Sequence, residues 1–117
     1  MNKQTRLESL GVYLPSQKIA TEDLIKKLKI DFPYNFSEIT GIKNRRFRSK
    51  IENSYVLGVK AAKQCLKKSK YRPENLDLII NTSITRFKDN NCFLFEPPLS
   101  LFIKQKIKAH SALSFDI

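Results

Sequence analysis

The 117-residue sequence has no tryptophan, three glycines, two cysteines and one histidine. Because the two cysteines have no neighbours at metal-ligand spacing, the sequence predicts neither a disulfide framework nor a metal site. No apolar run approaches the roughly 20 residues that a membrane-spanning helix requires, and the first ten residues contain no apolar signal region. These absences predict a cytoplasmic protein with two free thiols and no membrane segment.

Acidic residues are also scarce. Eleven Asp and Glu residues accompany 22 Lys and Arg residues, so that the net charge is +11 and the pI is about 9.8. A surface of this kind attracts polyanions, which include nucleic acid, an anionic membrane and an acidic protein. The 41% hydrophobic content is that of an ordinary globular protein. Charge alone does not choose among the three kinds of partner.

Hydrophobic patterning predicts three strands, over residues 5–15, 76–84 and 112–117. The first shows apolar alternation in its second half, and the second is a nearly continuous apolar run that is typical of a strand buried on both faces. Helices are expected between the strands. This order predicts an α/β fold with three mainly parallel strands and packed helices.

Three helices are expected. The first covers residues 20–30, with Thr21 as its N-cap, and the third begins after Pro97 and Pro98. The clearest helix covers residues 54–69 and carries two adjoining rows of mostly small residues suited to close packing: Leu57, Ala61 and Cys65, and Gly58, Ala62 and Leu66. Residues 31–42 are expected to be irregular with a short helical turn near Phe36, and residues 85–96 to form a loop.

Five segments in order carry a family resemblance: "LGVYLPSQKIATEDL", "TGIKNRR", "VKAAKQCLKKS", "LDLIINTSIT" and "EPPLSLFIKQKI" with "ALSFDI". Together they resemble the N-terminal part of β-ketoacyl-acyl-carrier-protein synthase III, a thiolase-fold condensing enzyme. The resemblance runs from about Leu7 to Ile117. It implies that residues 1–117 form an incomplete N-terminal thiolase-like domain of an acyltransferase in fatty-acid or related lipid or polyketide biosynthesis.

The resemblance also implies substrates and partners. Family members use acyl-coenzyme A or acyl-carrier-protein thioesters without a further cofactor, bind acyl carrier protein and form homodimers. Their nucleophilic Cys follows the strand that matches "FDI", and their catalytic His and Asn lie further on, so this chain alone is expected to be inactive. The alternative is a non-catalytic remnant or a basic binding module, with nucleic acid the less favoured partner.

The acid-free segment "KNRRFRSK", residues 43–50, has three interpretations. It is a solvated turn whose arginines pair with carboxylates, a site for the phosphates of coenzyme A or phosphopantetheine, or a nucleic-acid contact. A structural role is favoured for Arg45 and Arg46, because paired Arg is common in compact folds. Arg48 and Lys50 are the candidates for substrate or carrier binding.

Two family positions depart from the common pattern. The Trp and Arg that grip the coenzyme A nucleotide in the best-known branch fall at Asn35 and Ile39, which can neither stack nor pair in that way. Tyr34 or Phe36 could supply a ring if the loop is shifted. Glu96 matches a Glu that, in an olefin-forming branch, reaches across the dimer as a base; alternatively it favours a helix N-terminus electrostatically.

The remaining reactive side chains have structural expectations. Cys65 is expected to pack as a small hydrophobe on its helix, and Cys92 to lie in a loop without a catalytic partner. His110 is expected to be a surface or turn residue, because it does not match the catalytic His of the family.

Overall fold

The computed structural model describes residues 4–29, 31–83, 87–89, 92–93 and 97–117. The chain folds into two compact units, one formed by Leu14–Ser49 and the other by Met1–Tyr13 together with Lys50–Ile117. Among the described residues, no helix has the length and apolar character needed to cross a membrane.

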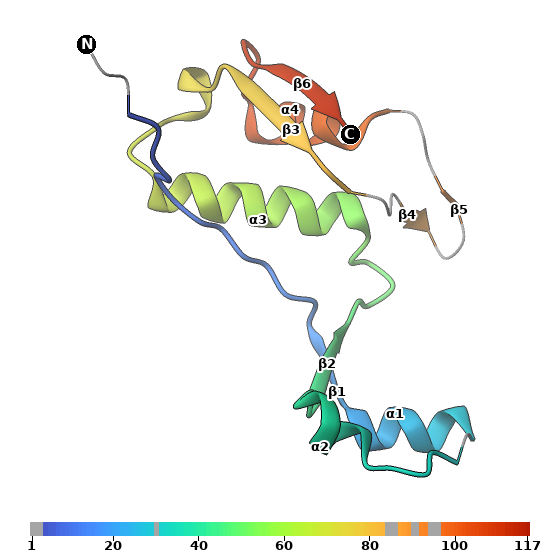
Figure 1. Ribbon diagram of the computed structural model, residues 1–117. Coiled ribbons are helices and arrows are strands. Elements are labelled where there is room, and N and C mark those ends of the chain that lie inside the picture. Colours follow the sequence, from blue (N-terminus) through green and yellow to red (C-terminus); the bar gives the residue numbers. More distant parts are fainter. Residues whose placement is uncertain (1–3, 30, 84–86, 90–91, 94–96) are drawn as a thin grey trace. The chain divides into compact units, whose positions relative to one another are not determined.

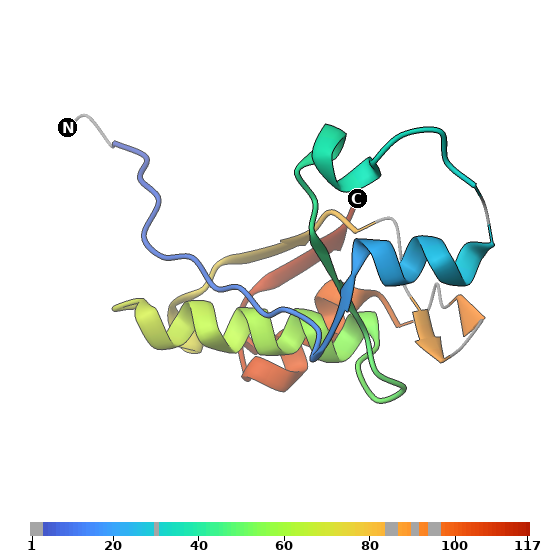
Figure 2. The ribbon, with the colours of Figure 1, turned by 90° about the horizontal axis from the view of Figure 1, so that it is seen from below.

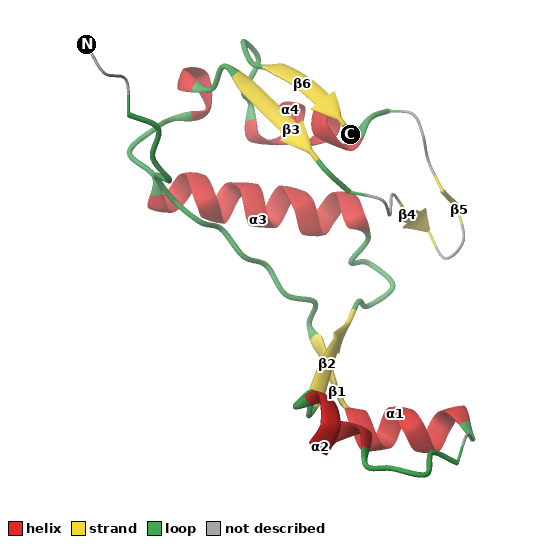
Figure 3. Cartoon of the chain, viewed as in Figure 1, coloured by secondary structure: helices red, strands yellow, loops and turns green. Residues whose placement is uncertain are grey.

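The smaller unit, Leu14–Ser49, combines two short strands with two helices (Figure 3). Strand β1 (Gln17–Ala20) pairs in antiparallel fashion with β2 (Asn44–Phe47). Between them in sequence lie α1 (Thr21–Leu28) and α2 (Phe36–Thr40). The short helical turn predicted near Phe36 is therefore confirmed, whereas neither strand was predicted.

Thr21 joins α1 to the chain that enters β2. The prediction that Thr21 caps the helix is wrong, because Ala20 is the N-cap and Thr21 is the first helical residue. Its N–H donates to Lys43 O at 3.0 Å, and its hydroxyl donates to Ile42 O at 2.5 Å. These carbonyls of the returning chain engage the hydroxyl that would otherwise cap the helix, and the residue is only 2% exposed.

The larger unit is built around two helices and a parallel strand pair (Figure 1). Its elements in order are α3 (Ser54–Lys68), the 3₁₀ turn η1 (Pro73–Asn75), β3 (Leu78–Asn81), β4 (Phe87–Asp89), β5 (Cys92–Phe93), α4 (Leu99–Ile107) and β6 (Leu113–Asp116). The helices predicted over residues 54–69 and after Pro98 are confirmed.

Strands β3 and β6 pair in parallel, and α4 forms the connection that returns the chain to the same edge. Figure 2 shows α4 against one face of this pair. Two of the three predicted strands, and their parallel pairing, are thus confirmed. On the α4 side lies the core of the unit, formed by Ile107, Ala109 and Ala112 with Ala62, Leu66, Leu76, Ile79 and Ile103.

Asp116, at the end of β6, caps α4 from a distance. Pro98 is the N-cap residue and has no side-chain cap of its own. The Asp116 carboxylate instead accepts from the N–H groups of Leu99 and Ser100, both at 2.8 Å. A carboxylate at a helix N-terminus is favourable because it satisfies free N–H groups and opposes the helix dipole.

The two small-residue rows of α3 serve two different neighbours. Ala62 and Leu66 pack on the core next to α4, and Gly58 lies beside Ile103. The other row meets the N-terminal segment, residues 4–13, at Gly11: a Cβ there would collide with Ala61 O and Cys65 N and lie 2.7 Å from Cys65 Cβ. The predicted close packing of this helix is confirmed on both rows.

The strand predicted over residues 5–15 is wrong, because residues 4–15 carry no regular structure. Their polar groups bind α3 instead of a neighbouring strand. Ser9 Oγ donates to Cys65 O at 3.1 Å, and the Val12 N–H donates to Gln64 Oε1 at 2.6 Å. Apolar alternation favours an extended backbone, but a strand also requires a partner for its N–H and C=O groups.

The loop predicted over residues 85–96 is wrong in part. Strands β4 and β5 pair in antiparallel fashion, with Phe87 opposite Phe93 and Asp89 opposite Cys92. Phenylalanine favours strands, so a short pair can form where the sequence shows no alternation.

Candidate functional site

The arginines of the basic segment make backbone rather than carboxylate contacts. Arg46 lies on β2, and its Nη1 donates to Pro15 O and Ser16 O, both at 3.4 Å. Within the described residues the one ion pair is Arg6–Glu8. The predicted pairing of these arginines with carboxylates is therefore wrong in detail, because Arg46 finds carbonyl groups of the strand-entry chain within reach.

The three predicted site residues are not brought into one site. Arg48 is half-buried and belongs to the smaller unit, whereas Lys50 is exposed and begins the second part of the larger one. Neither forms an ion pair with another described residue. Glu96 lies outside the described residues.

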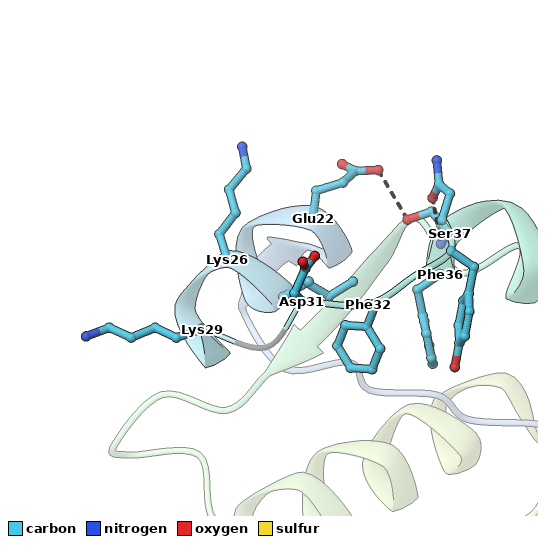
Figure 4. A pocket seen from close by; sticks show the side chains of 10 residues that line it. Glu22, Lys26, Lys29, Asp31, Phe32, Phe36 and Ser37 are labelled. Atoms are coloured by element: carbon cyan, nitrogen blue, oxygen red, sulfur yellow. Dashed lines mark hydrogen bonds between the residues drawn. The ribbon is translucent and has the colours of Figure 1, made fainter.

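The smaller unit contains a pocket of about 520 Å³ between α1 and the chain that leads into α2 (Figure 4). Its lining combines three aromatic rings with four charged side chains and few others: Glu22, Ile25, Lys26, Lys29, Asp31, Phe32, Tyr34, Asn35, Phe36 and Ser37. The sequence had singled out Tyr34 and Phe36 as possible rings, but not Phe32 or the lysines.

The three rings form one cluster. Tyr34 and Phe36 are stacked, with centroids 6.4 Å apart and ring planes inclined by 23°, and Phe32 lies 5.9 Å from Phe36 at 54°. Tyr34 remains 50% exposed. An exposed ring supported by a second ring offers a platform on which a planar group can stack.

The charged groups of the pocket balance one another. Lys26 and Lys29 bring two positive charges, and Glu22 and Asp31 bring two negative ones. Glu22 is partly engaged, because Ser37 Oγ donates to it at 3.1 Å. Both lysine chains extend outward from the rings (Figure 4), so the ammonium groups can reach an anion at the rim.

Asn35 has a structural task. Its side chain accepts from the N–H groups of Ser37, at 3.1 Å, and Glu38, at 3.4 Å, and so caps α2. Ile39 is 68% exposed. The cap lets the chain turn where the aromatic residues alternate, and this turn gathers Phe32, Tyr34 and Phe36 in one place.

A smaller apolar pocket of about 240 Å³ shares two of these rings. Phe32 and Phe36 line it together with Thr21, Leu24, Ile25, Leu28 and Arg45. Arg45 therefore contributes to a pocket wall, whereas the sequence predicted only a structural pairing for it.

The other candidate side chains show no reactive arrangement. Across the described ranges, no group of three His, Cys, Asp or Glu side chains could hold a metal ion. His110 lies exposed in a turn, as predicted. Cys65 is half-buried as expected for a packed thiol, but its Sγ lies 3.2 Å from Ser9 Oγ, so its surroundings are partly polar.

Comparison with known proteins places these elements in context. The chain is 42% identical over 117 residues to a β-ketoacyl-acyl-carrier-protein synthase III of Clostridium tetani, and 35% identical over 112 residues to that of Clostridium novyi. The predicted resemblance to synthase III is confirmed. The matches cover 99% and 96% of this chain but 32% of each relative, so the chain spans about a third of the length of these synthases. No protein-family model matches the sequence.

Solved structures agree with the α/β, thiolase-like fold. The 3-oxoacyl-acyl-carrier-protein synthase III of Aquifex aeolicus is 29% identical and superposes with a TM-score of 0.72 over 93% of this chain and 33% of its own. The priming β-ketosynthase of the R1128 polyketide pathway gives 0.75 over 100% of this chain and 35% of its own. At 22% identity, the second likeness supports the fold alone.

Proposed function

We propose that this chain is the N-terminal segment of a synthase III-like acyltransferase that condenses acyl thioesters in fatty-acid or related biosynthesis. The observation that carries the proposal is the 42% identity to the Clostridium tetani synthase III along 99% of the chain. The thiolase-like fold is compatible with this role.

The aromatic pocket of the smaller unit is proposed to bind the nucleotide end of an acyl-coenzyme A. Tyr34, supported by Phe36, replaces the family's Trp as a stacking surface for the base. Lys26 and Lys29 supply ammonium groups for the phosphates, which bind lysine as a compact positive charge. With Glu22 and Asp31 nearby, this grip is expected to be weaker than one that also contains arginine.

Arg48 and Lys50 are proposed to meet the acidic acyl carrier protein in the intact enzyme. Charges at the rim of such an interface steer association more than they add affinity. Glu96 is proposed as the base that acts across a homodimer, with favourable electrostatics at the start of α4 as the alternative. A cytoplasmic location is proposed as well.

A chimera tests the proposed activity. The residues of the Clostridium tetani synthase III that match this chain would be replaced by residues 1–117, and condensation of acyl-coenzyme A with a malonyl carrier would be measured. Activity within about tenfold of the parent enzyme is expected, because 42% identity preserves the packing pattern of the segment.

The same chimera separates the two function classes. A folded chimera without any acyl transfer would contradict the proposal and favour the non-catalytic remnant or basic binding module. Binding of the isolated chain to duplex DNA at physiological salt would favour that second class directly. The parent enzyme, expressed and assayed in parallel, is the positive control.

A further inference from the structure

One face of the β3–β6 pair carries large apolar side chains that remain open. Side chains alternate across a strand, so Leu78 and Ile80 share a face. In the parallel register they lie opposite Leu113 and Phe115. These four are 46%, 53%, 64% and 56% exposed, in that order. Together they form the open face of β3–β6.

The opposite face of the same strands is covered. Ile79, between Leu78 and Ile80, packs on the core formed by Ile107, Ala109 and Ala112. Helix α4 contacts both strands on that side. The pair is thus a two-sided apolar layer with a cover on one side, whereas parallel sheets are almost always covered on both.

The chemistry of the open face restricts its occupant. Nucleic acid is bound through contacts to its phosphates, which aliphatic and Phe side chains cannot provide. A second copy of this chain would bring two charges of +11 together, and such self-repulsion opposes association. The curated synthases are about three times as long as this chain, which spans 32% of them.

We propose that the open face of β3–β6 binds an amphipathic helix from the two thirds of a synthase III-like enzyme that this chain does not span. This inference rests on the proposed function. It adds an internal interface, with Leu78, Ile80, Leu113 and Phe115 as its contact residues. A helix with one apolar stripe fits because a sheet face and a helix stripe bury each other's apolar surface.

Cysteine labelling of the Clostridium tetani chimera tests the interface. Ile80→Cys and Leu113→Cys would be compared in the isolated chain and in the chimera by their rate of reaction with N-ethylmaleimide. Peptide mass spectrometry separates these positions from Cys65 and Cys92. The matched control is Ile51→Cys, because Ile51 is 82% exposed in the same unit and lies away from both strands.

The expected result is fast labelling of all three positions in the isolated chain. In the chimera, the two face positions should label at least about tenfold more slowly, because reaction then requires local opening, and Ile51→Cys should be unchanged. Equal labelling of the face positions in a cooperatively unfolding chimera would overturn the proposal. Slow labelling in the isolated chain, together with a dimer in sedimentation, would overturn it in favour of a second copy.

The activity of the chimera is measured separately. An active chimera with a reactive face would reject the interface and retain the proposed function. An inactive chimera with a protected face would support the interface and reject the function. The synthase III of Clostridium novyi, 35% identical to this chain, serves as a second host if the first chimera does not fold.

Discussion

Replacing Gly11 with alanine is expected to detach the N-terminal segment, residues 4–13, from α3. The new Cβ would lie 2.7 Å from Cys65 Cβ and closer still to Ala61 O and Cys65 N. Carbon atoms pack best at about 3.5–4.0 Å, so the segment must move by roughly 1 Å. The obstructing oxygen and nitrogen belong to the α3 backbone and cannot rotate away.

The magnitude follows from the contacts that this movement breaks. Ser9 Oγ would lose its bond to Cys65 O, and the Val12 N–H would lose Gln64 Oε1. Each hydrogen bond contributes about 0.5–1.5 kcal/mol net, so the segment should be weakened by about 1–3 kcal/mol. The loss cannot exceed the free energy with which residues 4–13 bind α3, because the rest of the unit can remain folded.

Thiol reactivity is the sensitive assay, because Cys65 Sγ lies against Ser9. With each 1.4 kcal/mol worth about tenfold in the opening equilibrium, Cys65 in Gly11→Ala should react with maleimide about 5- to 150-fold faster under native conditions. Urea unfolding followed by circular dichroism gives the stability change independently.

Gly58→Ala is the matched control. Its Cβ would lie 3.1 Å from Ile103 Cδ1, the far end of a flexible side chain. Alanine also favours a helix interior by about 0.5–1 kcal/mol over glycine. This variant should therefore keep or slightly raise stability and leave Cys65 unchanged. The close-approach reasoning fails if Gly11→Ala has the stability and Cys65 reactivity of the parent chain.

Three further predictions concern the cap, the pocket and the basic segment. Asp116→Ala should lower the free energy of unfolding by about 1–3 kcal/mol in urea titrations, because the α4 N-terminus loses two charge-assisted bonds; Asp77→Ala, at an exposed position before β3, should change it by less than about 0.5 kcal/mol. Tyr34→Leu in the chimera should raise KM for acyl-coenzyme A about 5- to 100-fold, since a lost stacking contact is worth about 1–3 kcal/mol, without changing KM for a pantetheine-only thioester. Reversing Arg48 and Lys50 to Glu in the chimera should raise KM for carrier-bound substrate, leave kcat nearly unchanged, and have a smaller effect at high salt.

Each of these has a contradicting result. An Asp116→Ala chain as stable as the parent would mean that the α4 N-terminus is satisfied by other groups. Equal KM changes for both thioesters in Tyr34→Leu would assign the ring a structural role. Equal losses for carrier-bound and small substrates after charge reversal would do the same for Arg48 and Lys50.

The sequence could predict the elements that carry a continuous apolar signal. Helix α3 has two complete rows of small residues, α4 has an apolar stripe after two prolines, and β3 is an apolar run. Strands β1 and β2 have the sequences QKIA and NRRF, which show no clear apolar alternation. Their pairing depends on tertiary contacts such as the Thr21 bonds to Ile42 and Lys43, which no local pattern records.

The candidate site was predictable in part for a related reason. The alternation of Phe32, Tyr34 and Phe36 is visible in the sequence, and two of these rings were singled out as possible stacking groups. Their convergence depends on the Asn35 cap, which fixes where α2 begins and how the chain approaches it. The neighbouring lysines come from α1, so their presence at the pocket follows from the packing of two helices rather than from a motif.

The failed strand prediction for residues 5–15 and the open face of β3–β6 have the same physical origin. Leu10 and Val12 alternate as in a strand, yet their side chains remain about 60% exposed and their backbone binds a helix. Leu113 and Phe115 do form a strand, and one face of it is likewise open. In both places the sequence pattern anticipates neighbours that the described chain does not supply. A pattern of this kind specifies a surface to be buried, and the structure of a segment records only the part of that burial for which the segment itself provides the partner.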